Sequence, residues 1–248
     1  MPNPVKLLAR VSSVESCGQG VYSVRLAPES PVPRFKAGQF LHMTVDDYDR
    51  AGGFWPESRV FSIASAPGAA ELRIVYSVKG RYTRLMEQRL APGLEVWLKL
   101  PYGEFIVEAA AARDQDIVLV AGGTGLSPFM PYLEEVALSG AKGRGIFLYY
   151  GARRNAMLLA RETIGRCVAA GSVTATIAIE EEEPGSDIPP GVKAEGGRLD
   201  IGRIRGACGR LRDPVFFISG PPPMIKAFRE NLIGLGIGPG NIKTDDWE

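Results

Sequence analysis

Cysteine and histidine are scarce in this sequence, and their scarcity excludes several kinds of metal site. The chain of 248 residues contains three cysteines, Cys17, Cys167 and Cys208, and one histidine, His42. The cysteines are far apart and no CxxC pair occurs, so the usual spacings of a four-ligand zinc or iron–sulfur site are missing. The motifs HExxH and GxSxG are absent too. We therefore predict no metal site, and we interpret His42 as an ordinary strand residue.

The sequence also lacks a charge bias and long apolar runs. Its formal net charge is +1, and aromatic residues are not interleaved with clustered lysines, so nothing favours a nucleic-acid partner. No run approaches the roughly 18 apolar residues of a membrane span, and the N-terminal apolar run is short for a signal peptide. An odd, scattered set of cysteines suits a reducing compartment. We expect a cytoplasmic protein with no nucleic-acid partner and no membrane insertion.

The pattern of apolar residues changes near residue 110. Before that point, six short strand-like runs alternate with turns rich in glycine and proline, and a helix-like segment (83–90) interrupts them. This pattern is typical of a small antiparallel barrel or sandwich. Residues 107–116 are small and polar, as in a linker or a short helix. We predict two domains, residues 1–110 and residues 111–248.

The second half has the pattern of alternating strands and helices. Residues 116–123 form a continuously apolar run, as expected of a strand that is buried on both faces. A helix should follow, starting at Ser127 or Pro128 and ending at Gly140. Further strands and helices alternate up to a last strand at 241–247, which predicts a parallel sheet. We interpret the tract 180–197 as a mobile surface loop.

Glycine-rich and charged segments follow the predicted parallel strands. Residues 122–128, GGTGLSP, combine glycines with a helix start, which could bind a phosphate or be a plain glycine-rich connection. Pro128 occupies the third glycine position of GxGxxG, so the standard dinucleotide motif is not present. Arg153 and Arg154 follow the next strand, where a ribose or its phosphate could lie. Because ligands bind at the carboxyl ends of parallel strands, we expect a nucleotide at this edge.

The first half carries a second set of ligand-binding candidates. Arg59 and Phe61 alternate along an extended strand and should share a face, with Ser62 beside them. A guanidinium can hold a phosphate while an aromatic ring stacks on a planar heterocycle. Residues 80–83, GRYT, start the helix-like segment and form a second candidate anion site. The two halves together suggest two nucleotide-like cofactors.

Eight motifs occur in an order that resembles the ferredoxin–NADP reductase superfamily of flavoproteins, above all the reductase components of bacterial oxygenases. The motifs cover nearly the whole chain: GQF (38–40), RVFS (59–62), GRYT (80–83), PYGEF (101–105), GGTGLSPF (122–129), YGAR (150–153), GGRL (196–199) and SGPPPMI (219–225). The resemblance implies a flavin-binding antiparallel six-stranded β-barrel (1–110) followed by an NAD(P)-binding α/β domain with a parallel sheet (111–248).

The resemblance also implies roles for residues of the first half. Arg59 would hold a flavin phosphate, Phe61 would stack on the isoalloxazine and Ser62 would hydrogen-bond flavin N5. Gly80 and Thr83 would lie at the flavin pyrophosphate. The cofactor-binding set in this half is completed by the remaining residues of the two motifs, Val60 and Arg81.

In the second half the resemblance points to the pyridine nucleotide. Its pyrophosphate would lie at Gly123, Thr124 and Gly125, and Arg153 would bind near the ribose. The nicotinamide would lie beside the segment Ser219, Gly220, Pro221 and Pro222.

Two positions depart from the family pattern. Ser219 replaces the usual cysteine, and Asp245-Asp246-Trp247 replaces a Glu-x-aromatic ending. Trp247 could cover the other face of the flavin or be a core residue. The predicted catalytic residues are Ser62, Ser219, Asp245 and Trp247.

The implied activity is that of an NAD(P)H-dependent flavin oxidoreductase. FAD is favoured over FMN, and NADH slightly over NADPH, because Glu180 follows a strand where NADP-using relatives often place Ser-Arg. The electrons would go to a separate acceptor protein, such as a ferredoxin or an oxygenase component. Lys79, Arg81, Arg84 and Arg89 could form its docking face or be an ordinary solvated helix surface. The alternatives are a reductase of free flavin or another small acceptor, and an electron-transfer subunit of a larger redox complex.

Overall fold

The chain folds into two compact units. A computed structural model describes residues 3–208 and 211–245. The chain divides into Met1–Ile106, called the barrel unit below, and Val107–Glu248, called the α/β unit. The division lies at the start of the small, polar segment 107–116.

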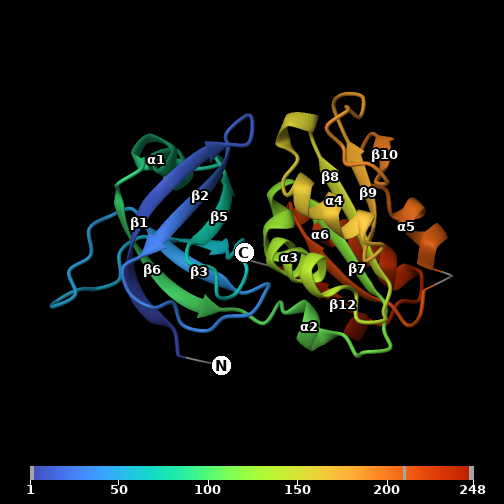
Figure 1. The fold of residues 1–248 in the computed structure, drawn as a ribbon, viewed down its shortest axis with the longest axis horizontal. Helices are drawn as coiled ribbons and strands as arrows, with labels where there is room; N and C mark the ends of the chain where they lie inside the picture. The colour runs from blue at the N-terminus through green and yellow to red at the C-terminus, as the bar shows by residue number, and fades with distance from the viewer. Residues whose placement is uncertain (1–2, 209–210, 246–248) are drawn as a thin grey trace. The chain divides into compact units, whose positions relative to one another are not determined.

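The barrel unit is a nearly closed antiparallel sheet (Figure 1). Its strands, in sheet order, are β4 (Arg59–Ser62), β3 (Phe40–Thr44), β6 (Glu95–Tyr102), β1 (Val5–Ser16), β2 (Val21–Pro28) and β5 (Leu72–Ser77). The two ends of this order meet just after β4, where the amide of Ala64 donates to the carbonyl of Arg73 at 2.7 Å. The predicted six-stranded antiparallel barrel is confirmed.

Apolar residues from alternate strand positions fill the barrel, and one helix, α1 (Arg81–Arg89), packs against them. Tyr82 and Met86 lie four residues apart, so they share one face of α1, and both are buried. His42 lies on β3, opposite Lys99 of β6. Its partial burial and the nearby lysine charge lower the pKa of His42. The prediction that His42 is a strand residue is confirmed.

The α/β unit is built around a parallel sheet. Its strands, in sheet order, are β10 (Lys193–Gly196), β9 (Thr174–Ile179), β8 (Ile146–Ala152), β7 (Ile117–Gly122), β11 (Val215–Ser219) and β12 (Ile242–Thr244). Every residue of β7 and β11 is buried, as their continuously apolar sequences predict. The predicted parallel sheet is confirmed.

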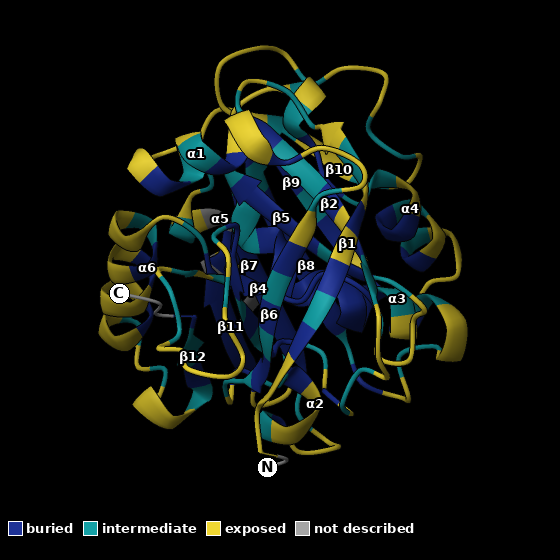
Figure 2. Ribbon diagram, turned by 90° about the vertical axis from the view of Figure 1, so that its left-hand side faces the viewer, coloured by how far each residue is buried: buried dark blue, intermediate teal, exposed yellow. Residues whose placement is uncertain are grey.

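Helices cover both faces of the parallel sheet. Figure 2 shows α3 (Met130–Ser139) and α4 (Arg161–Ala169) on one side, with α5 (Ile201–Cys208) and α6 (Pro222–Gly234) on the other. The remaining short elements are α2 (Val107–Ala110), η1 (Gly123–Phe129), η2 (Asn155–Met157) and η3 (Pro239–Asn241), the last three being 3-10 helices. Within the described residues, no helix is long and apolar enough to cross a membrane.

Two expectations about this unit are wrong, and one of its helices was not predicted. The helix expected from Ser127 or Pro128 begins at Met130, because the 3-10 helix η1 occupies the preceding residues. Part of the tract 180–197 is the strand β10, which is mostly exposed and polar and is defined by its pairing with β9. The helix α5 was not expected, since its glycines lower helix propensity.

Candidate functional site

The residues predicted to bind the flavin ring lie on the short strand β4. Ser62 is 8% exposed and pairs in register with Phe40 of β3. Phe61 is 9% exposed and belongs to the barrel core, where its ring meets the edge of the Tyr76 ring at a centroid distance of 6.2 Å. The core thus fixes Phe61 in place, and little of the ring is left accessible to a ligand.

Arg59 is the first residue of β4. Its guanidinium contacts Tyr82 and Glu57. It lies 4.6 Å from the centre of the Tyr82 ring, a cation–π contact with helix α1. Its Nη2 lies 2.7 Å from Oε1 of Glu57, and Nη2 of Arg81 lies 3.1 Å from Oε2 of the same carboxylate. The structure therefore brings together a predicted phosphate ligand, Arg59, and another predicted cofactor-binding residue, Arg81, around one carboxylate. No motif in the sequence points to Glu57, although its place two residues before Arg59 is a usable signal.

A threonine hydroxyl caps the start of α1. Oγ1 of Thr83 accepts hydrogen bonds from the amides of Lys79 at 2.9 Å and Gly80 at 3.1 Å. The amides of the first helical turn have no acceptor within an α-helix, so they remain suited to an anion. Thr83 thus has a structural task at the helix start in addition to its predicted place near a pyrophosphate.

Two glycines that follow β7, Gly123 and Gly125, lie in different surroundings. Gly123 has φ +54°, and no atom lies within 4 Å of the place where a Cβ would be, so the space in front of it is open. At Gly125 a Cβ would lie 2.4 Å from the carbonyl oxygen of Ser219 and 2.5 Å from the amide of Gly220. Gly125 is therefore required for close packing of η1 against the end of β11. Open space at Gly123 fits a ligand, while Gly125 is explained by packing alone.

Two predicted catalytic residues, Ser219 and Asp245, meet at the carboxyl end of this sheet. Oγ of Ser219, at the end of β11, donates to Oδ2 of Asp245 at 2.9 Å. The amide of Asp245 donates to the carbonyl of Ile218 at 3.0 Å, which continues the pairing of β12 with β11. Both residues are less than one-tenth exposed. Trp247, the fourth predicted catalytic residue, lies outside the described residues.

The arginines that follow β8 are paired with a carboxylate that follows β9. Nε of Arg153 lies 3.3 Å from Oε1 of Glu181, and Nε of Arg154 lies 2.8 Å from Oε2. Arg198 likewise pairs with Glu180, at 2.6 Å between Nε and Oε1. The pairs are largely exposed, so each is weak, but together they place acidic side chains next to the arginines at this sheet edge.

The basic residues of the α1 region are partly neutralised. Arg81 pairs with Glu57, and Nη1 of Arg89 lies 2.9 Å from Oδ1 of Asp46. Lys79 and Arg84 are exposed. The proposed docking face is therefore less basic than its sequence suggests.

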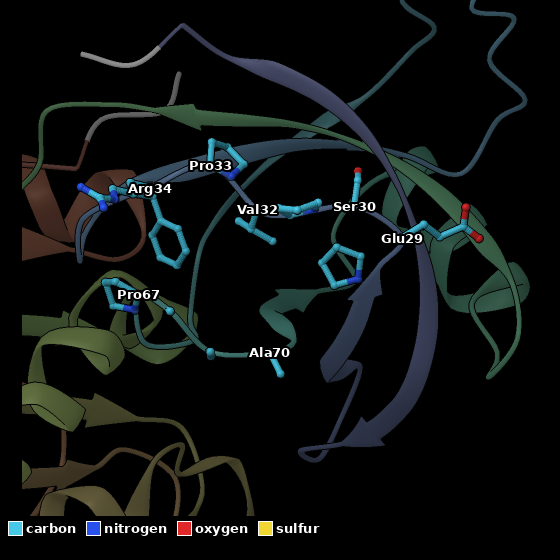
Figure 3. Close-up of a pocket in the computed structure, with 12 residues that line it drawn as sticks. Glu29, Ser30, Val32, Pro33, Arg34, Pro67 and Ala70 are labelled. Carbon is cyan, nitrogen blue, oxygen red and sulfur yellow. The ribbon is translucent and has the colours of Figure 1, made fainter.

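The barrel unit has a hollow that is lined by residues outside the predicted site. It has a volume of about 670 Å³ and is lined by residues 28–35 and 67–70, none of which is a predicted site residue. Figure 3 shows Glu29 and Arg34 near its opposite ends, with prolines and small side chains between them. This surface offers no convergent set of polar groups.

The buried cysteine of the α/β unit has no chemical role in this arrangement. Sγ of Cys167 contacts the carbonyl of Leu133 at 3.2 Å, and burial raises the pKa of the thiol to about 11. A thiol with a raised pKa is a poor nucleophile. In residues 3–208 and 211–245, no three His, Cys, Asp or Glu side chains gather as metal ligands.

The chain thus combines an antiparallel barrel that has arginines at its rim with a parallel sheet whose strand β7 leads into the glycine-rich 3-10 helix η1. Residues 119–230 match the family model of the oxidoreductase NAD-binding domain. This match covers less than half of the chain, and all of it lies in the α/β unit.

The chain matches two known proteins over different shares of their length. The reductase component of propane 2-monooxygenase from Rhodococcus jostii (strain RHA1) is 29% identical over 95% of this chain, which covers 62% of that protein. An NAD(P)H-flavin reductase from Aliivibrio fischeri is 28% identical, and the match covers 90% of both chains. This chain thus spans about three-fifths of the first relative and nearly all of the second.

The fold is also found among solved structures. A ferredoxin NADP+ reductase from Neisseria gonorrhoeae, solved with bound FAD and NADP, aligns with a TM-score of 0.74 over 99% of both chains. Its sequence is only 18% identical. The two proteins share the architecture of barrel and parallel sheet.

Proposed function

We propose that this protein is an NAD(P)H-dependent flavin oxidoreductase that passes electrons from a bound FAD to a separate acceptor. The observation that carries this proposal is the convergence of Arg59 and Arg81 around one carboxylate, next to β4, the strand that carries Phe61 and Ser62. Guanidinium pairs of this kind suit phosphate groups, and the negatively charged Glu57 carboxylate already lies between them.

The barrel residues fit a flavin in distinct ways. When bound, a flavin accepts a hydride from the nicotinamide and releases electrons to an acceptor. Arg59 and Arg81 would bind its phosphates, and the Ser62 hydroxyl would hydrogen-bond N5. Phe61 would contact the isoalloxazine through the small part of its ring that the core leaves exposed. The rigid placement of Phe61 and Ser62 lowers the entropic cost of orienting the flavin ring.

The α/β unit fits the pyridine nucleotide. The open space at Gly123 would admit the pyrophosphate, with Thr124 beside it. Ser219 would lie beside the nicotinamide, and Asp245 would hold its hydroxyl hydrogen, so that the Ser219 oxygen offers its lone pairs to a donor. Gly220, Pro221 and Pro222 shape this turn into α6.

We propose that NADH is preferred to NADPH. Glu181 already contacts both Arg153 and Arg154, the arginines best placed for a 2′-phosphate. Glu180 follows β9 at the same edge. Carboxylates accept hydrogen bonds from ribose hydroxyls and repel a phosphate.

The acceptor is proposed to be a separate protein, such as a ferredoxin or an oxygenase component. The similarity of this chain to the reductase component of propane 2-monooxygenase supports this proposal. Reduction of free flavin is the second candidate, and a specific observation favours it: the NAD(P)H-flavin reductase is matched over 90% of its length. The expected cytoplasmic location and the lack of a nucleic-acid partner remain predictions.

Anaerobic reduction of the purified protein tests the proposed function. Protein saturated with FAD should lose its flavin absorbance on addition of NADH, and more slowly with NADPH. A chain that binds neither FAD nor FMN contradicts the proposal. The acceptor is then tested by comparing turnover with a ferredoxin against turnover with excess free FMN, which separates the two candidates.

A further inference from the structure

Glu57 occupies the position between two arginines that the proposed function assigns to flavin phosphate. Its Oε1 lies 2.7 Å from Nη2 of Arg59, and its Oε2 lies 3.1 Å from Nη2 of Arg81. Each carboxylate oxygen thus faces one guanidinium, in the same way as two oxygens of a phosphate group would. No motif of the superfamily described above includes this residue.

A buried side chain holds the main chain of Glu57 in place. The hydroxyl of Tyr82 donates to the Glu57 carbonyl at 3.0 Å, and the Val45 amide donates to the same hydroxyl at 3.1 Å. Tyr82 is 3% exposed, and its ring lies against the guanidinium of Arg59. The carboxylate is therefore positioned by the packing of α1 on the barrel.

Arg59 has limited capacity for a further anion while Glu57 is in place. Nη1 of Arg59 donates to the carbonyl of Ser58 at 2.8 Å, and its Nη2 donates to Glu57. The side chains of Glu57 and Arg59 are 42% and 45% exposed, so a ligand can reach them. Two arginines and one glutamate sum to one positive charge, and the loss of Glu57 would leave two.

We propose that Glu57 competes with the flavin phosphate for Arg59 and Arg81, and thereby makes the bound flavin exchangeable. This inference rests on the proposed function. It names the affinity-setting residue of the phosphate site and the class of ligand that the residue acts on, namely phosphorylated flavins. An exchangeable flavin suits an enzyme that reduces free flavin.

The test compares three flavins on the full chain and on Glu57→Gln. FAD and FMN carry phosphate and riboflavin does not, and each is titrated by the quenching of its fluorescence. Glu57→Gln should bind FAD and FMN about fivefold more tightly than the wild type, the size expected for exposed charge pairs. Riboflavin affinity should not change. The gain should shrink at high KCl, because salt screens exposed charges.

The matched control is Glu95→Gln, which removes the same charge from the same unit at a carboxylate that pairs with Arg10. It should leave all three affinities unchanged. The inference is overturned if Glu57→Gln binds FAD and FMN no more tightly, or if riboflavin gains as much as they do. If no flavin binds to either protein, the proposed function fails and this inference fails with it.

Discussion

The barrel unit and the α/β unit differ in the kind of group that we propose to bind anions. At the barrel rim the groups are side chains, Arg59 and Arg81, fixed by packing on Tyr82 and by Glu57. In the α/β unit the main candidate is backbone, the 3-10 turn that begins at Gly123. Side-chain charge gives affinity that a single substitution can tune, whereas a backbone site depends on close packing of the elements around it.

The two units also differ in where their carboxylates come from. Glu57 precedes Arg59 by two positions in the chain. Glu181 reaches Arg153 and Arg154 from the end of a neighbouring strand. The first pairing joins residues that are near neighbours in the chain, and the second exists only because β8 and β9 are adjacent and parallel.

The largest expected effect is that of Gly125→Ala in the α/β unit. Its Cβ would overlap the backbone of Ser219 and Gly220, which cannot move away as a side chain can. We expect a loss of about 3 kcal/mol in the free energy of unfolding, measured by denaturant titration followed by circular dichroism. FAD affinity, a property of the barrel unit, should be kept in native buffer.

Gly123→Ala is the matched control for that substitution. Its Cβ meets no atom, and only the positive φ opposes it, so the cost should be about 1 kcal/mol. Equal losses in the two variants would contradict the distinction between a packing glycine and an open one.

Asp116→Asn tests a buried carboxylate of the α/β unit. Asp116 accepts hydrogen bonds from the amides of Gly145 and Arg212, both at 2.8 Å, and from the Arg212 guanidinium at 3.2 Å. Asparagine would direct an NH₂ group at one of these donors. We expect a loss of about 2 kcal/mol at pH 7. Asp187→Asn, at an exposed pair with Arg161, should change stability by less than about 0.5 kcal/mol.

The pH dependence of this effect has a definite sign. Burial by itself would raise the pKa of Asp116, but the hydrogen bonds from Arg212 and Gly145 outweigh it and lower the pKa. A lowered pKa in the folded state means that the charged carboxylate stabilises the fold above its ordinary pKa. That contribution is lost as the pH falls through the folded-state pKa. The difference between wild type and Asp116→Asn should therefore shrink below about pH 4, and a constant difference would refute this account.

Arg59→Ala tests the side-chain site of the barrel unit. Loss of a charge-assisted contact to phosphate should cost about 2 kcal/mol, or roughly a 30-fold weaker affinity for FAD and FMN. Riboflavin affinity should be unaffected. Arg84→Ala removes the same charge from an exposed position of α1 and should leave flavin affinity intact. A similar loss in both variants would show that only the general charge of this face matters.

The smallest expected effect is that of Glu181→Gln on coenzyme preference. Release of Arg153 and Arg154 should raise the ratio of kcat/KM for NADPH to that for NADH about fivefold, since these are exposed charges. Glu183→Gln removes the same charge two residues further along. An equal change in both variants would mean that the effect comes from the overall charge of the loop.

The sequence predicted the architecture because apolar periodicity is a local property. Short runs punctuated by glycine and proline predicted the barrel, and continuous apolar runs predicted the buried parallel strands β7 and β11. The secondary-structure predictions failed where the local sequence pattern gave no signal or the wrong one. The strand β10 is mostly exposed and polar, so only its pairing with β9 reveals it.

In the candidate site, too, some features could be predicted from the sequence and others could not. The motifs around Arg59, Ser62, Gly123 and Ser219 are readable in the sequence, and their roles toward flavin and nicotinamide remain proposals. Two features were not readable from any motif: the Glu57 bridge between Arg59 and Arg81, and the packing need at Gly125. Both depend on which segments meet after folding.

By itself the sequence determined two units of different class and the order of their motifs, because strand and helix periods and turn residues act over a few neighbouring positions. Only the tertiary structure decided which charges neutralise each other and which glycines are open. Glu57 reaches Arg81 across 24 residues, and the hydroxyl of Ser219 reaches Asp245 across 26. Contacts over such sequence distances form only when strands pair and helices pack. The same pairing and packing determine which charged side chains are close enough together to bind a charged ligand.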